Sequence, residues 1–186
     1  MNKTMKTMSP LIPPRDDEFL RKLVRRASAI NGREFPNFLR ILAHSPATLK
    51  ACLNFNNALD HGLLAPQVRV RIALLMVELN CCRYSLSIYG EEGRRVGLSE
   101  EEIRQARQAK AGDPVGTAVL LFTLDFVLQR GRISPKELAA LKSAGFSDAH
   151  VVEIIANIAE NMFVNYFNIS MATPVDFRLV SPGTEI

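Results

Sequence analysis

Helix-start signals recur along this chain of 186 residues. Ser or Asp stands directly before Pro at the start of three apolar-periodic segments, at Ser45-Pro46, Asp113-Pro114 and Ser134-Pro135. The first side chain of such a pair caps a helix, and proline fits the first helical position. Ser99 with Glu102, and Ser134 with Glu137, have the spacing of a capping box. The chain is therefore predicted to be built from helices.

The helix boundaries follow from these caps, from apolar residues at helical spacing and from glycines that end a helix. The expected helices cover about 16–30, 46–60, 114–129, 134–145 and 147–170, and two more begin at Pro66 and after Ser99. No segment combines alternating β-branched residues with hairpin turns, so no strand is expected. We expect an all-α, single-domain helical bundle over residues 15–180, with a loose N-terminal arm at 1–14 and a C-terminal tail at 181–186.

Composition narrows the class of protein. The chain is 47% hydrophobic and 23% charged, an ordinary globular balance. No apolar run reaches the ~18 residues of a membrane span, and no segment has the pattern of a signal peptide. Three cysteines do not form a secreted disulfide framework, so a cytoplasmic protein is expected.

Charge and residue spacing argue against two kinds of partner. The net charge of +4 comes without clustered basic residues and interleaved aromatics, so nucleic-acid binding is not expected. No His, Asp or Cys pair has metal-ligand spacing, so neither a metal site nor another cofactor is predicted.

The residues with the most chemical potential lie in one segment, from Glu78 to Tyr89. If this segment is helical, Cys82, Ser85 and Tyr89 share one face, because they are three and seven residues apart. If Asn80 breaks the helix, Cys82 instead comes near a new helix N-terminus, where the helix dipole favours a thiolate. The structural alternative is that the cysteines are small buried hydrophobic residues.

Several short segments follow one another in a familiar order. They are Phe35-Pro36-Asn37, Leu42-Ala43-His44-Ser45-Pro46, Glu78-Leu79-Asn80 before Cys82-Arg83-Tyr84, Gly97-Leu98-Ser99-Glu100-Glu101-Glu102-Ile103, Gly145-Phe146-Ser147-Asp148, Asn165-Tyr166-Phe167-Asn168 and Asp176-Phe177. With this order and spacing, the chain resembles the carboxymuconolactone decarboxylase and alkylhydroperoxidase D family. The resemblance implies the alkylhydroperoxidase D-like helical fold and a homo-oligomer.

The resemblance also implies a set of site positions. In peroxide-reducing members, the motif is C-x-x-C-x-x-x-H with a Glu about three helical turns upstream; the second Cys attacks the peroxide, the first resolves it, and His and Glu relay protons. In this chain Cys82 matches the first Cys, but Ser85 stands at the second, Tyr89 at the His and Val70 at the Glu. A further family His corresponds to Ile169.

These replacements change the expected chemistry. A serine hydroxyl forms no disulfide, so the classical two-cysteine peroxidase cycle is not expected to run. Tyrosine, whose reference pKa is about 10, is a poor proton shuttle near neutral pH. A disulfide between the adjacent Cys81 and Cys82 would be strained. Oxidation of Cys82 alone, with rescue by an outside thiol, stays open as antioxidant hydroperoxide reduction, whereas Cys52 is expected in the core.

Two non-redox alternatives also stay open, so the sequence does not decide whether the chain is an enzyme. By resemblance to the decarboxylases, Glu78, Tyr89, Ser85 and His44 could serve acid–base chemistry on a small organic acid or lactone. The structural alternatives are a buried carboxylate paired with an arginine for Glu78, and a turn residue for His44.

The other alternative is a non-catalytic binding module with a small-molecule ligand. A small, mostly apolar pocket is expected beside Cys82. Residues of the last helix could line such a pocket, pack in the core or face a second subunit; they are Met162, Phe163, Tyr166 and Phe167.

Overall fold

The computed structural model describes Ser9 and residues 36–176. The helix expected at 16–30, the tail and all of the arm except Ser9 lie outside the described residues. The described part is helical without a strand, as predicted. Its helices are α2 (Asn37–Leu42), α3 (Pro46–Asp60), α4 (Pro66–Leu79), α5 (Arg83–Arg95), α6 (Glu100–Arg107), α7 (Pro114–Leu128), α8 (Pro135–Ser143) and α9 (Asp148–Ser170).

The predicted helix caps are present. A side-chain oxygen accepts a hydrogen bond from the backbone N–H three residues on at Ser45, Ser99, Asp113 and Ser134. The capping box of Ser99 is complete, because the Glu102 carboxylate accepts the Ser99 N–H at 2.9 Å. The box predicted at Ser134 is only half formed: Glu137 donates its N–H to Ser134 Oγ at 3.0 Å, and the reciprocal bond is not made.

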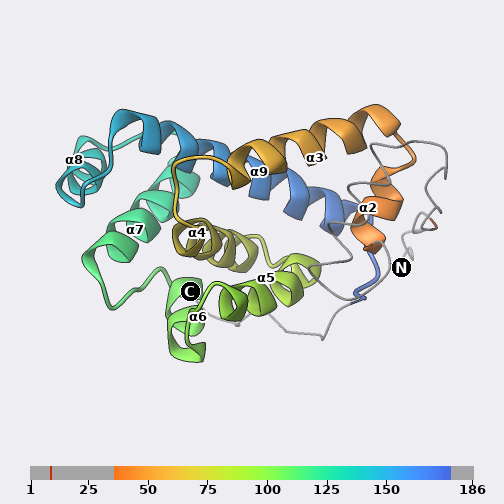
Figure 1. Ribbon diagram of the computed structural model, residues 1–186, viewed down its shortest axis with the longest axis horizontal. Coiled ribbons are helices and arrows are strands. Elements are labelled where there is room, and N and C mark those ends of the chain that lie inside the picture. The colour runs from red at the N-terminus through yellow and green to blue at the C-terminus, as the bar shows by residue number, and fades with distance from the viewer. Residues whose placement is uncertain (1–8, 10–35, 177–186) are drawn as a thin grey trace, which may run out of the picture.

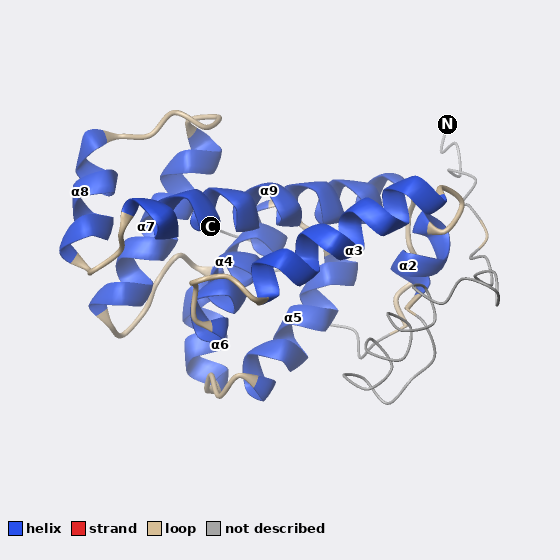
Figure 2. Cartoon of the chain, turned by 45° about the horizontal axis from the view of Figure 1, so that its top comes forward, coloured by secondary structure: helices blue, strands red, loops and turns tan. Residues whose placement is uncertain are grey.

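Helix α9 contacts more than one part of the fold. It packs against α3, α4, α5 and α7, and it runs alongside α3 (Figures 1 and 2). Helices α7 and α8 form the end of the molecule opposite α2. Because α9 contacts four other helices, its inward side chains meet several parts of the interior.

Helix α4 is buried on all sides. Ile72 and Met76 belong to a core cluster with residues of α7 and α9, whereas Leu74 and Leu75 belong to a second cluster with residues of α6 and α7. A third, smaller cluster lies between α2 and α3 and includes Cys52. Fully burying one such aliphatic side chain contributes roughly 1.5–3 kcal/mol. Tyr89 of α5 packs against the second of these clusters.

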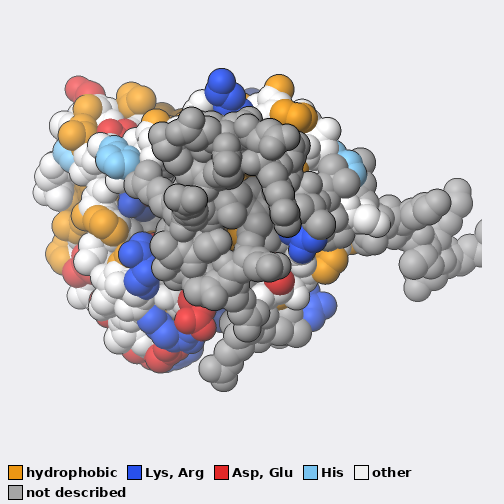
Figure 3. Space-filling view, turned by 45° about the vertical axis from the view of Figure 1, so that its right-hand side comes forward, with side chains coloured by type: hydrophobic (Ala, Val, Ile, Leu, Met, Phe, Trp, Pro, Cys, Tyr) orange, Lys and Arg blue, Asp and Glu red, His pale blue; other side chains and the backbone are white. Residues whose placement is uncertain are grey.

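The surface has mixed charge. Acidic and basic side chains lie beside one another on the described part of the face in Figure 3. Several of them form ion pairs within or between neighbouring helices, such as Arg95 with Glu92 and Arg104 with Glu101. Within the described residues, every helix is too short or too polar to cross a lipid bilayer.

Candidate functional site

The turn between α4 and α5 fixes the positions of the two adjacent cysteines. Asn80 ends α4, and Cys81 takes the left-handed conformation with φ of 52°. The N–H of Cys81 donates to the Glu78 carbonyl, and the N–H of Cys82 to the Val77 carbonyl, each at 2.9 Å. This is the Schellman arrangement, which reverses the chain direction within two residues. Cys81 is therefore exposed, whereas Cys82 is buried and begins α5.

Cys82 and Ser85 form the buried centre of the site. The Cys82 thiol donates to Ser85 Oγ at 3.3 Å, and each residue is 1% exposed. Of the two arrangements that the sequence left open, the structure has the helix break at Asn80. Ser85 and Tyr89 still follow Cys82 on the same side of α5, since they lie three and seven residues on.

All three cysteines are free. Cys52 lies in α3 within the core cluster under α2, as expected. Burial, with a smaller effect of the Glu160 charge, raises the pKa of the Cys52 thiol to about 12. Cys52 therefore stays protonated at neutral pH and is a poor nucleophile. Cys82 is also buried, but its thiol bonds a polar group of α5, the Ser85 hydroxyl.

Tyr89 lies one turn beyond Ser85, half-buried against the cluster shared by α4 and α6. Burial raises the pKa of its phenol well above the ordinary value, and the charges of Glu160 and Glu92 raise it further. The phenol is therefore a hydrogen-bonding group and not a proton acceptor at neutral pH. The helix that carries Tyr89, α5, packs against α9.

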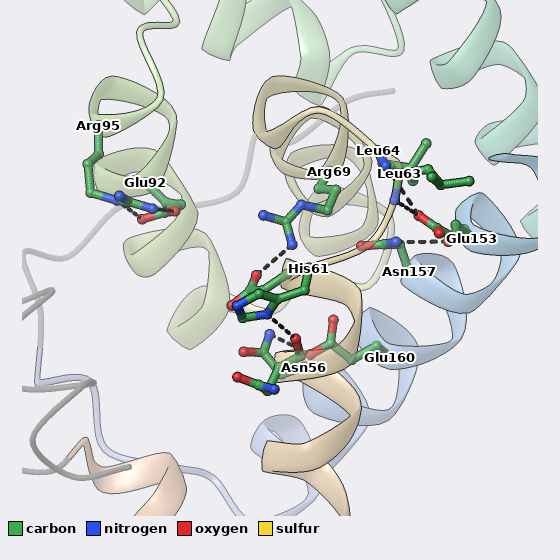
Figure 4. A network of polar contacts seen from close by, with 12 residues as sticks. Asn56, His61, Leu63, Leu64, Arg69, Glu92, Arg95, Glu153, Asn157 and Glu160 are labelled. Carbon is green, nitrogen blue, oxygen red and sulfur yellow. Dashed lines mark hydrogen bonds and ion pairs between the residues drawn. The ribbon is translucent and has the colours of Figure 1, made fainter. Parts of the chain in front are cut away.

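Glu160 is a buried carboxylate that the sequence analysis missed. It is 6% exposed and accepts a hydrogen bond from Asn56 Nδ2 at 2.9 Å across the contact between α3 and α9 (Figure 4). Burial is the main reason why its pKa is raised. The available signal was weak: Glu160 is a carboxylate beside Asn161 in α9, where the other buried polar side chains are amides.

Glu78 forms an ion pair between two helices. Its carboxylate accepts a hydrogen bond from Arg107 Nε at 2.8 Å, which joins α4 to α6. Its carbonyl meanwhile accepts the Cys81 N–H in the turn. The structural alternative for Glu78, a buried carboxylate paired with an arginine, is thus the arrangement observed.

The remaining candidate residues lie in a turn, in the core or on the surface. His44 lies exposed in the turn between α2 and α3, and its Nε2 is 3.0 Å from the Ser9 carbonyl. Val70 packs in the apolar cluster of α4 and α6, and Ile169 is exposed on α9. The structure thus brings together Cys82 and Ser85, with Tyr89 following on the same helix, while Glu78 pairs with Arg107 and His44 lies beside Ser9.

The N-terminal end of α5 is closed by contacts from both ends of the described chain. The buried Tyr84 hydroxyl accepts the Phe38 N–H at 3.1 Å and also bonds the Asp176 carboxylate. The Asn37 N–H donates to that same carboxylate at 2.9 Å. The rings of Phe38 and Phe167 meet at 5.7 Å. This end of α5 therefore lies beside the C-terminal part of α9.

Two hollows of the described surface lie away from Cys82. One is lined by residues between α3 and α4 and by the turn before α9, including Leu64 and His150. The other lies between α7 and α8 and includes Leu121. No cluster of three or more potential metal ligands occurs among residues 36–176 or at Ser9. The apolar pocket expected beside Cys82 stays a prediction.

The fold is that of known protein structures. It is similar to the debrominase Bmp8, solved as a cysteine-to-alanine variant in complex with 2,3,4-tribromopyrrole: the TM-score is 0.78 at 18% identity, over 92% of this chain and 93% of that one. It is also similar to an alkylhydroperoxidase AhpD core, a peroxidase-related protein from Ralstonia eutropha JMP134, with a TM-score of 0.77 at 21% identity over 86% of each chain.

A third similar structure is a peroxidase-related protein from Silicibacter sp. TM1040, with a TM-score of 0.72 at 21% identity over 95% of each chain. No protein-family model matches the sequence, and no curated protein matches it. The fold defined by these structures is the alkylhydroperoxidase D-like helical fold, as the resemblance implied.

Proposed function

We propose that this protein is a diverged alkylhydroperoxidase D-like enzyme that binds a small organic molecule beside Cys82 and reduces it with that single thiol. The observation that carries the proposal is the buried contact between Cys82 Sγ and Ser85 Oγ at 3.3 Å. Oxygen stands where an internal disulfide would need a second sulfur. An outside thiol must then complete the cycle.

The reaction with a hydroperoxide runs in two stages. The Cys82 sulfur attacks one peroxide oxygen, the O–O bond breaks, and the alcohol leaves with the thiol proton, so that Cys82 becomes a sulfenic acid. An outside thiol then forms a mixed disulfide with Cys82 and releases water. A second outside thiol restores Cys82 and is itself oxidised to a disulfide.

The likeness to the debrominase Bmp8 supports testing a second class of electrophile. With an organobromine compound, the sulfur takes the bromine while the carbon takes the thiol proton. An outside thiol then displaces bromide as hydrogen bromide and leaves a mixed disulfide on Cys82. Both reactions use the same nucleophile, so one set of variants tests them.

The experiment follows consumption of cumene hydroperoxide and of 2,3,4-tribromopyrrole in the presence of dithiothreitol. We expect turnover of at least one of them by the wild type, loss of it in Cys82→Ala, and retention in Cys81→Ser, the matched exposed-cysteine control. Dimedone should label Cys82 after peroxide treatment without thiol. A disulfide between two cysteines of the chain would contradict the proposal, and so would turnover of neither compound, which favours a binding module.

Acid–base chemistry is a second candidate because of Glu160. Its carboxyl group is buried, and burial raises its pKa, so it can hold a proton at a higher pH than an exposed glutamate. Under this candidate, Glu160→Gln abolishes turnover of a small lactone while Cys82→Ala leaves it unchanged. The reverse pattern, or no lactone turnover, excludes it.

A further inference from the structure

Buried amides without partners gather at the C-terminal end of α9. Asn165 is 0% exposed and Asn168 is 3% exposed, and neither the oxygen nor the nitrogen of either side chain has a hydrogen-bond partner within the described chain. The hydroxyl of Thr173, just after the helix, is likewise buried without a partner there. An unpaired buried polar group costs about 1–3 kcal/mol, so several together call for a physical reason.

The same helix shows how such amides can be satisfied. Asn157 Nδ2 donates to the Glu153 carbonyl at 2.8 Å, and Asn161 Nδ2 donates to the Asn157 carbonyl at 2.9 Å, each one turn back. Asn165 and Asn168 do not make this bond. Their amide groups stay available, on the face of α9 that the neighbouring helices cover.

A chain of contacts links the start of α5 to the end of α9 that carries these amides. Tyr84, at the start of α5, accepts the Phe38 N–H, and the Phe38 ring contacts Phe167. Phe167 lies between Asn165 and Asn168 in the sequence, and α5 packs against α9. The start of α5, with Cys82 and Ser85, therefore lies near the amide-bearing end of α9.

Burial selects against an anion. An anionic ligand would give up its hydration beside side chains that are only 0% and 3% exposed, whereas a neutral ligand loses much less on entering the same place. A carboxamide instead pairs with a neutral group that carries a donor and an acceptor side by side.

We infer that Asn165 and Asn168 form, beside Cys82 and Ser85, a binding site for a neutral small molecule that presents an N–H or O–H donor next to an acceptor, such as an amide. This inference rests on the proposed function for its location and names the class of ligand for that site. A ligand with an acceptor alone satisfies only half of each carboxamide, and an anion loses its hydration on burial.

The test uses three probes of the same shape: propionamide, with donor and acceptor; butanone, with acceptor only; and propionate, an anion. Binding is followed by NMR through the side-chain NH₂ signals of the ¹⁵N-labelled full chain. We expect propionamide to shift the Asn165 and Asn168 signals and to bind roughly tenfold more tightly than either other probe, which corresponds to about 1.4 kcal/mol. Equal affinities for the three probes would overturn the inference.

Variants separate this site from structural asparagines. Asn165→Leu and Asn168→Leu each remove unpaired polar atoms, so we expect a higher melting temperature and a loss of propionamide binding of about tenfold. Asn157→Leu is the matched control, because its amide donor is already bonded, and it should leave the affinity unchanged. A lower melting temperature with unchanged affinity in both Leu variants would show that the two amides are structural.

The binding readout is independent of the thiol reaction, because propionamide contains neither an O–O nor a C–Br bond for the Cys82 thiol to attack. If the amide site is confirmed and no electrophile is turned over, only the proposed reduction fails. If turnover depends on Cys82 and propionamide does not bind, only the amide site fails.

Discussion

At the scale of single residues, the hydroxyl of Ser85 and the thiol of Cys82 already touch. A disulfide needs its two β-carbons about 3.5–4.5 Å apart, and two side chains whose ends are in contact one helical turn apart come close to that geometry. Replacing the Ser85 oxygen by sulfur would therefore give a dithiol site without a change in the backbone.

This contact gives a direct prediction for Ser85→Cys. We expect that mild oxidation links the new sulfur to Cys82 and removes two free thiols per chain, as counted by mass spectrometry after alkylation. Ser87→Cys is the control, since Ser87 donates to the Arg83 carbonyl and lies off the Cys82 face. A Ser85→Cys chain that keeps all its thiols under the same oxidant would show that the site cannot accept the bond.

Cys81 takes a left-handed backbone conformation that side chains with a β-carbon disfavour by about 1–2 kcal/mol. Replacement by glycine relieves this strain but adds freedom to the unfolded chain, which offsets part of the gain. We predict that Cys81→Gly raises the free energy of unfolding by about 0.5–1 kcal/mol, measured with urea. Cys81→Ser keeps the β-carbon and should show no gain; a stabilised serine variant would assign the effect to the sulfur.

Glu160 predicts a pH dependence of stability. Burial raises the pKa of its carboxyl group in the folded chain, so the folded state binds this proton more tightly than the unfolded state does. The resulting stabilisation is fully present below the ordinary glutamate pKa of about 4.3, and is lost as the pH rises through the raised folded value.

Glu160→Gln removes this titration and keeps an oxygen that can accept from Asn56. At pH 7 we expect the variant to unfold at a higher urea concentration than the wild type, with the gap closing as the pH falls toward 4. Glu91→Gln, at an exposed position, is the control and should show no such trend. A gap that is independent of pH would contradict a raised pKa of Glu160.

The residue scale is also where the sequence is least informative. The exposure of Cys81 and the burial of Cys82 follow from one left-handed residue, and left-handed positions are usually held by glycine or asparagine. Glu160 accepts a hydrogen bond from Asn56, which lies 104 residues earlier in the chain. The roles of Glu160, Asn165 and Asn168 depend on tertiary neighbours that no local pattern encodes.

At the scale of helices, local chemistry determines most of the boundaries. The capping residues Ser45, Ser99 and Asp113 act as predicted, because a cap and its N–H partner lie within one turn. The short α2 was not predicted; it starts at Asn37 without a side-chain cap and is held by the cluster with α3. Elements that rely on packing are therefore the ones that sequence patterns miss.

The start of α9 has a capping box with an unusual member. Ser147 Oγ accepts the His150 N–H at 3.4 Å, while His150 Nδ1 lies 3.2 Å from the Ser147 N and 2.7 Å from its Oγ. Histidine thus takes the place of the usual Glu or Gln. Its ring also packs edge-on against Phe146 at 5.7 Å.

This box predicts the effect of two substitutions. His150→Ala should lower the free energy of unfolding by about 0.5–1 kcal/mol, because the Ser147 N–H loses its acceptor. His150→Glu restores an acceptor at the helix N-terminus and should recover most of the loss. Thermal unfolding at pH 7.5 measures both. Equal losses in the two variants would assign the effect to the ring contact with Phe146.

At the scale of the whole molecule, α9 presents both an inward and an outward apolar face. Its exposed large side chains are Val152, Phe163, Tyr166 and Ile169. Exposed apolar groups on one long helix favour association with a second apolar surface. Of the four residues that the sequence placed in a pocket, the core or an interface, Phe163 and Tyr166 are exposed, whereas Met162 and Phe167 pack against core clusters.

We therefore propose that copies of this chain associate through the outward face of α9. Light scattering after size exclusion should give a native mass that is a multiple of the 20.7 kDa chain. Phe163→Glu should reduce that mass, while Lys136→Glu, at an exposed position on α8, should not. A wild-type mass of one chain would contradict the proposal.

The packing of α9 against α3, α4, α5 and α7 has a consequence for biosynthesis. Translation produces those four helices before α9, so each must wait for the partner that follows it from the ribosome. Until α9 has been made, the nascent polypeptide displays the sides that α9 later covers. Those sides meet the solvent during synthesis and are withdrawn from it when α9 docks.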